Sequence, residues 1–158
     1  MNKNVIISVK GVQTGTTTQD KNKLELVTEG KYYKKGNTYF VSYKESQVTG
    51  MEGTTTTLKV TEDGIITLMR IGSVNTQFIF EKGQKHLSYY DTQHGTFTVG
   101  VLTNTVNIDV NEKGGEIRVF YRLEIDNNKA GDNDFYMNIR EAQQLDEAAY
   151  SENIKIWN

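Results

Sequence analysis

The amino-acid sequence predicts an all-β protein, built as a closed antiparallel barrel of about ten strands in meander order. Residues that favour strands dominate, with 19 threonines, 13 valines and 12 isoleucines against 8 leucines and 4 alanines. β-Branched side chains suit a pleated, half-buried surface, whereas leucine and alanine favour helices. The chain also has 14 glycines and no proline, so its turns rely on glycine, asparagine and aspartate.

Ten strand-like runs follow one another along the chain. They cover residues 4–13, 23–34, 38–46, 54–61, 64–71, 74–81, 85–93, 95–109, 116–125 and 134–141. The turns between them include Lys35-Gly36-Asn37, Glu62-Asp63-Gly64, Gly72-Ser73, Lys82-Gly83, His94-Gly95 and Lys113-Gly114-Gly115. Turns this short join antiparallel neighbours. Closure into a barrel removes exposed edges, which favours a barrel over the alternative of a two-sheet sandwich.

The run 116–125 shows the clearest alternation of apolar and polar side chains. One face carries Ile117, Val119, Tyr121, Leu123 and Ile125, and the other carries Glu116, Arg118, Phe120, Arg122 and Glu124, with Phe120 as the exception. Successive side chains of a strand point to opposite faces, so this strand is predicted to have one dry face and one mostly wet face. The runs 38–46 and 134–141 alternate in a similar way.

The run 64–71 is unusual because both of its faces are apolar. Ile66 and Leu68 share one face, while Ile65, Met69 and Ile71 share the other. Something must therefore cover the outer wall of the barrel. Apolar residues recur at helical spacing near the C-terminus, at Ala142, Leu145, Ala148 and Ala149. We expect residues 1–143 to form the barrel domain and residues 144–158 to be a C-terminal extension, a short helix or tail that packs outside it, unless a partner subunit covers that wall.

Charge and composition argue against several classes of protein. Without cysteine, the chain has neither a disulfide framework nor thiolate chemistry. A net charge of −2 and a pI of 5.7 disfavour a general nucleic-acid binder, which needs a basic surface. The apolar run Val5–Val9 is too short for a signal peptide, and no stretch approaches membrane-spanning length. These features predict a cytoplasmic protein that has no membrane partner.

Several short motifs, taken in order, resemble a known family. They are Tyr43-x-Glu45, Thr49-Gly50-Met51-Glu52-Gly53, the threonine run that ends in Thr57-Leu58-Lys59, Leu68-Met69-Arg70-Ile71-Gly72, Phe78-Ile79-Phe80-Glu81-Lys82-Gly83, Tyr90-Asp91-Thr92-Gln93-His94-Gly95 and Tyr121-Arg122-Leu123-Glu124-Ile125. Over about residues 4–141, the sequence resembles the YwiB-like family of small uncharacterised bacterial proteins. The resemblance implies a calycin-like (lipocalin-like) barrel, and it brings neither a demonstrated activity nor a catalytic residue.

Arg70 is the most informative charged residue, because it follows Ile66 and Leu68 on one face of an otherwise apolar strand. If that face lines the interior, Arg70 is a buried cation that needs an anion. The anion could be Glu45, or a carboxylate or phosphate of a ligand held in a bidentate fork. If that face lies outside, Arg70 is a surface residue with a packed stem.

The first functional hypothesis is a non-enzymatic barrel that binds a small apolar or amphipathic ligand with an anionic end. The candidate binding residues are Tyr39, Tyr43, Glu45, Arg70, Phe97, Tyr121 and Leu123. This hypothesis includes no cofactor, no metal and no catalytic residue. An alternative is an interaction module that acts through its outer surface. It would form a homodimer or bind a protein through the Ile66 and Leu68 face, or touch RNA through the basic, aromatic run 31–35.

Two enzymatic or metal-binding interpretations are weaker. Glu45 and Glu52 flank a glycine-containing loop and could form an acid–base pair, although carboxylates beside glycines more often solvate a turn. His86, Asp91 and His94 have the ligand types of a metal site, but their spacing is nonstandard.

Overall fold

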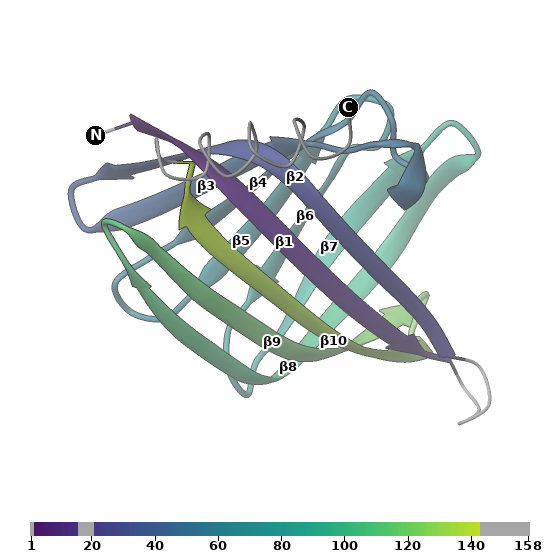
Figure 1. Ribbon diagram of the computed structural model, residues 1–158. Helices are drawn as coiled ribbons and strands as arrows, with labels where there is room; N and C mark the ends of the chain where they lie inside the picture. Colours follow the sequence, from purple (N-terminus) through teal and green to yellow (C-terminus); the bar gives the residue numbers. More distant parts are fainter. Residues whose placement is uncertain (1, 16–20, 143–158) are drawn as a thin grey trace.

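The computed structural model describes residues 2–15 and 21–142, and it is an antiparallel barrel (Figure 1). Its strands are β1 (Asn2–Thr14), β2 (Lys21–Lys35), β3 (Thr38–Lys44), β4 (Thr55–Val60), β5 (Ile66–Ile71), β6 (Thr76–Phe80), β7 (Lys85–Thr92), β8 (Gly95–Asn111), β9 (Gly114–Ile125) and β10 (Asn128–Glu141). A 3-10 helix, η1 (Gln47–Thr49), follows β3. The all-β fold and the ten predicted strands are confirmed.

The strands form one sheet in the order β6-β5-β4-β3-β2-β1-β10-β9-β8-β7, so every neighbour but one is also a neighbour in sequence. The exception is the pair β1 and β10, which brings the two ends of the meander together. The sheet curls until β6 meets β7, where an isolated bridge joins Asn75 to Asp91. A side chain adds to this contact between β6 and β7, because the Ser88 hydroxyl donates a hydrogen bond to the Gln77 carbonyl. The barrel is thus nearly closed rather than fully closed by a backbone ladder.

The main difference from the predicted strands lies at the start of β10. The sequence predicts a strand from residue 134, whereas β10 begins at Asn128. Asp126 and Asn127 form the preceding two-residue turn with φ of 51° and 70°, the backbone that aspartate and asparagine tolerate best after glycine. The register then shifts between Lys129 and Gly131. This bulge interrupts the alternation of inward and outward side chains. The first part of β10 therefore lacks the pattern by which a strand is predicted.

The core follows the predicted alternation closely. The fully buried residues include Ile7, Leu58, Ile66, Ile117 and Val119, each 0 % exposed. Phe120, the predicted exception in its strand, is 39 % exposed on the outer wall. Ile66 and Leu68 belong to the core, so the hypothesis of a dimer or protein contact through their face is wrong, because that face is the interior. On the opposite face of β5, Ile71 is 70 % exposed.

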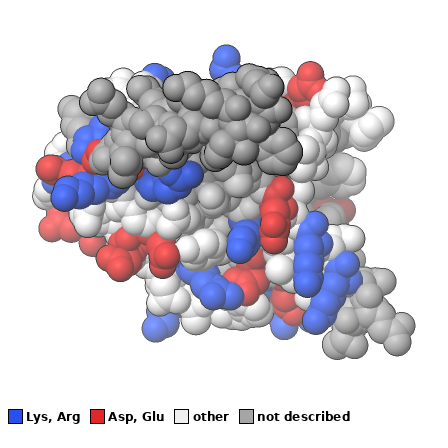
Figure 2. Space-filling model, in the orientation of Figure 1, with Lys and Arg blue, Asp and Glu red and all other residues white. Residues whose placement is uncertain are grey.

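The proposed cover of the outer wall, residues 144–158, lies outside the described residues. Within the described ranges, no helix has the length and apolar character needed to cross a membrane. On the face shown in Figure 2, acidic and basic side chains are interspersed rather than gathered by sign. Ion pairs across β9 and β10 are of this kind, such as Arg118 with Asp134 at 2.8 Å and Arg122 with Asp132 at 3.1 Å.

The barrel has a mouth at the end where the odd-numbered strands finish. There β2 and β3 separate. β3 pairs with β2 only from Gly30–Tyr43 to Lys35–Thr38, because β3 stops at Lys44 and the chain turns into η1. Among the described residues, the first part of β2, residues 21–29, pairs with β1 alone. The interior is therefore open on this side.

Candidate functional site

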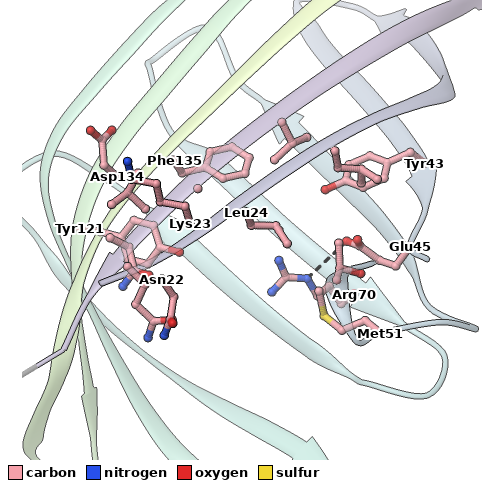
Figure 3. Close-up of a pocket in the computed structure, with 17 residues that line it drawn as sticks. Asn22, Lys23, Leu24, Tyr43, Glu45, Met51, Arg70, Tyr121, Asp134 and Phe135 are labelled. Atoms are coloured by element: carbon pink, nitrogen blue, oxygen red, sulfur yellow. Dashed lines mark ion pairs between the residues drawn. The ribbon is translucent and has the colours of Figure 1, made fainter. Parts of the chain in front are cut away.

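A cavity of about 350 Å³ lies in the mouth of the barrel. Its walls come from the end of β1, the first parts of β2 and β10, the end of β3 with the segment that follows it, and single residues of β5 and β9. Figure 3 shows Leu24 and Phe135 at the apolar wall, with Arg70 and Glu45 facing them from the other side of the cavity. The separation of β2 from β3 is what leaves room for it.

Arg70 points into the barrel. The register places Tyr43 beside Thr56 and Thr56 beside Arg70, and cross-strand neighbours share a face. Since Tyr43 is 5 % exposed and Thr56 is 0 % exposed, this face is the interior. The interior orientation is therefore the one that the fold adopts, and the Arg70 side chain is 18 % exposed.

Glu45 supplies the matching negative charge. It is 6 % exposed, and its backbone N–H donates to the Thr54 carbonyl at 2.8 Å, which holds the residue beside β4 after β3 has ended. Its Oε2 accepts a hydrogen bond from the Thr56 hydroxyl and lies 3.9 Å from Arg70 Nε. The structure thus brings together the two charged residues that the sequence singled out.

The ion pair leaves hydrogen-bonding capacity unused. A separation of 3.9 Å is within ion-pair range but too long for a hydrogen bond. Glu45 Oε1 and Arg70 Nε are buried, and neither has a hydrogen-bond partner among the described residues. Buried polar atoms are nearly always satisfied in folded proteins. These two atoms therefore mark the wall of the cavity as a place where a polar group of a ligand can be held.

Two tyrosines that line the cavity, Tyr43 and Tyr121, have raised pKa values. Burial raises the pKa of Tyr43, the negative charge of Glu45 raises it further, and Arg70 partly opposes both effects. Burial also raises the pKa of Tyr121, again with Arg70 opposing. Both phenols therefore remain neutral at physiological pH and can donate a hydrogen bond.

The raised pKa of Tyr43 predicts a loss of stability in alkali. A tyrosine in the unfolded chain ionises near pH ~10, whereas Tyr43 in the barrel keeps its proton to higher pH. Its contribution is complete below the unfolded pKa and is lost as pH rises toward the folded value, by ~1.4 kcal/mol per pH unit. Urea unfolding from pH ~9 to ~11.5 should show a smaller slope for Tyr43→Phe than for the wild type. Equal slopes would contradict the assignment.

A row of polar side chains runs from strand to strand around the mouth of the barrel. The register aligns Asn22 with Gln13, Gln13 with Asn133, Asn133 with Tyr121 and Tyr121 with Thr103. We call Gln13, Asn22 and Asn133 the amide belt, and all three line the cavity. Asn133 Nδ2 is buried with no hydrogen-bond partner among the described residues, so the belt offers a second unmet donor.

Four of the predicted binding residues line the cavity, namely Tyr43, Glu45, Arg70 and Tyr121. Tyr39 does not. It lies on the inward face, but toward the other end of the barrel, where its ring stacks on Tyr32 at 5.4 Å. Leu123 is partly buried and packs against the core, and it is not part of the cavity wall.

The prediction that Phe97 lines the interior is wrong. Phe97 is 40 % exposed, although it pairs with Tyr90 on β7. The pairing of β9 with β8 begins at Val99, so no second strand of the described part of the chain pairs with β8 at Phe97. Alternation shows on which face of its strand a residue lies. It does not show whether the rest of the barrel wall extends far enough to cover that residue.

Most of the lining residues that the sequence analysis missed lie on β1, β2 and β10. Those on the inward faces include Gly11, Gln13, Asn22, Leu24, Leu26, Asn133 and Phe135, and Thr49 and Met51 of the segment after β3 were missed as well. The alternation of Val9, Gly11 and Gln13 in one strand and of Asn22, Leu24 and Leu26 in the next carries the signal. Carboxamides on an inward face depart from the apolar pattern and would have pointed to a polar mouth.

The other candidate sites are not assembled in the structure. Glu52 is exposed and lies at a separate hollow of about 630 Å³, beside Ser73 and His94, so it does not share the cavity with Glu45. His86 lies 3.0 Å from Glu81. Across residues 2–15 and 21–142, no three histidine, aspartate or glutamate side chains come close enough to hold a metal ion.

The basic, aromatic run 31–35 is partly used by the fold. Tyr32 is 1 % exposed, and its hydroxyl donates to the Asn111 carbonyl at 2.7 Å. Tyr33 stacks on Phe40, with their ring centroids 4.9 Å apart. Because alternate residues of a strand face opposite sides, only one of the two tyrosines is on the outer wall.

Comparisons with known proteins agree with this architecture. The DUF1934 family, described as a domain of unknown function, matches residues 7–137. The uncharacterized beta-barrel protein YwiB of Bacillus subtilis (strain 168) is 29 % identical over 102 residues, which are 65 % of this chain and 70 % of that protein. The crystal structure of the ywiB protein from Bacillus subtilis has a TM-score of 0.79, with 22 % identity, over 90 % of this chain and 94 % of that one.

The structural likeness shows a shared barrel fold, and it confirms the resemblance to YwiB seen in the sequence. The family match begins within β1 and ends within β10. It therefore includes the strands that build the cavity as well as those that build the core. The chain belongs to the DUF1934 family, a domain of unknown function.

Proposed function

We propose that this protein is a non-catalytic barrel that binds a small amphipathic ligand in its mouth. The observation that carries the proposal is a cavity of about 350 Å³ whose apolar wall faces a buried ion pair with unmet hydrogen bonds. Ligand sites in proteins are concave and mostly apolar, with a few placed polar groups, and this volume is at the lower end of their usual range.

The two walls suggest how such a ligand would lie. Leu24, Leu26, Met51 and Phe135 supply an apolar surface that would cover its apolar part. Arg70 and Glu45 would meet its polar end. Hydrogen bonds from that end to the two charged groups would fix the orientation, because hydrogen bonds to charged groups are stronger than neutral ones.

A binding role is supported over a hydrolytic one by the state of the carboxylates. Glu45 Oε2 is engaged by Thr56 and Arg70, and Glu52 lies in a different hollow. A two-carboxylate mechanism needs both groups on either side of one substrate bond. The barrel offers instead one engaged carboxylate beside a cation, which is an arrangement for holding a molecule in place.

Native mass spectrometry of the protein purified from cells that express it naturally tests the proposal. We expect a mass above that of the chain alone, which is removed by denaturation and belongs to one small molecule per barrel. A chain that carries no such mass, under conditions that retain ligands in other barrels, would overturn the proposal.

Gly11→Leu should block the cavity and abolish this extra mass. Gly11 lines the cavity, and a Cβ at this position would meet no atom within 4 Å, so a side chain can enter the free space without displacing the core. Lys10→Leu is the matched control, because Lys10 is the exposed neighbour on the outer face of β1. Retention of the ligand by Gly11→Leu at wild-type occupancy would place the binding site elsewhere.

A further inference from the structure

The formal charges around the cavity cancel. Among the described residues, two cations, Lys23 and Arg70, and two anions, Glu45 and Asp134, line it. Lys23 and Asp134 both pair with Val12 and lie in its row, which alternates with the inward row of Gly11 and Gln13. The Asp134 carboxylate points away from the cavity (Figure 3) and is bound by Arg118, with contacts of 3.0 and 2.8 Å. The interior is thus left with one cation and one anion.

An ion cannot satisfy both members of this pair. A carboxylate or phosphate placed against Arg70 would also face the free Oε1 of Glu45, which accepts hydrogen bonds and repels a negative charge. An ammonium group placed against Glu45 would face the guanidinium. Because Arg70 Nε and Glu45 Oε2 are 3.9 Å apart, a group bound to one charge is necessarily close to the other.

A neutral group that has a donor beside an acceptor meets both demands. Its carbonyl oxygen would accept from Arg70, and its N–H would donate to Glu45 Oε1. The amide belt suits the same kind of neutral group, because carboxamides both donate and accept hydrogen bonds. Asn133 Nδ2 is one such donor without a partner among the described residues. Tyr43 and Tyr121, whose raised pKa values keep them neutral, add no charge to this environment.

We infer that the buried end of the ligand is a neutral amide-type group, an N–H next to a C=O, as in a carboxamide, a lactam or the edge of a pyrimidine ring. This inference rests on the proposed binding function and replaces the anionic end expected from Arg70 alone. From the sequence alone, Glu45 and a ligand anion are alternative partners of Arg70, and the presence of Glu45 at the cation changes the chemistry that the cavity selects.

Three probes of nearly the same shape test the charge preference directly. Benzamide is neutral with adjacent donor and acceptor, benzoate is an anion and benzamidine is a cation. Titration of each into ¹⁵N-labelled protein can be followed at the side-chain amide signals of Gln13, Asn22 and Asn133. We expect benzamide to bind about tenfold more tightly than either ion, because each ion leaves one buried charged group without a partner.

Two variants test the origin of that preference. Glu45→Gln should shift the order toward benzoate, because Arg70 is then uncompensated. Arg70→Gln should shift it toward benzamidine. The amide spectrum of each variant shows whether it is folded, and the order measured for the wild type remains decisive if a variant does not fold.

The outcomes separate this inference from the proposed function. If benzoate or benzamidine shifts the belt signals at lower concentration than benzamide, the inference fails while the cavity remains a binding site. If benzamide causes no shift, the inference fails as well. The proposed function fails only if native mass spectrometry also finds no small molecule bound to the barrel.

Discussion

Replacement of Glu45 by alanine is expected to destabilise the barrel by about 3 kcal/mol. The Glu45 side chain is 1 % exposed and faces Arg70, whose side chain is 18 % exposed. Removal of one member of a buried pair leaves the other charge uncompensated, which typically costs 3–5 kcal/mol. We place the effect at the lower end because Arg70 keeps some contact with water. The Thr56 hydroxyl also loses its acceptor.

The control for this prediction is the double variant Glu45→Ala with Arg70→Met. Methionine retains much of the length of arginine and carries no charge, so the double variant should recover most of the stability that the single variant loses. Urea unfolding of the wild type, both single variants and the double variant completes the cycle. Additive losses, with the double variant less stable than either single one, would show that the two charges do not stabilise each other.

Replacement of Gly72 by alanine is expected to cost about as much, ~3 kcal/mol. Gly72 has φ +141°, and a Cβ there would lie 2.1 Å from the Gly53 carbonyl oxygen and 2.8 Å from the Thr54 Cα. Both neighbours are backbone atoms, so the loop must move rather than one side chain. The displaced segment includes Thr54, just before β4, whose carbonyl accepts a hydrogen bond from the Glu45 N–H. The substitution should therefore disturb the cavity as well as the stability.

Gly64→Ala is the matched control. Gly64 also has a positive φ, +86°, but a Cβ there would meet nothing within 4 Å. Its substitution should cost only the backbone strain, ~1 kcal/mol. Chemical unfolding of the two variants side by side measures the difference. Similar losses would mean that strain alone, and not the close approach of Gly53, explains the need for glycine at position 72.

Much of the fold could be predicted from local patterns. The alternation of Ile117 and Val119 with charged residues placed one face of β9 inside, and both residues are fully buried. Glycine at Gly36, Gly64 and Gly83 marked turns that do adopt positive φ. These features depend on a residue and its near neighbours, which is why a single sequence carries them.

The candidate site could be predicted only in part. Tyr43, Glu45, Arg70 and Tyr121 share the cavity, but Tyr39 lies near the other end of the barrel and Phe97 beyond the edge of β9. Alternation reports whether a side chain points in or out. It contains no information about the height of that residue along the barrel axis, which depends on the stagger between strands.

The sequence by itself determined the all-β class, the ten strands, most of the turns between them and the inward face of strongly alternating strands such as β9, while the inward face of β5 stayed open. Tertiary structure alone decided that β3 ends early enough to open a cavity, that the carboxylate after it meets Arg70, and that three carboxamides from separate strands lie at one level. The physical reason is that side-chain alternation is a local property of a strand, whereas a binding site depends on the register and lengths of strands that are far apart in the chain.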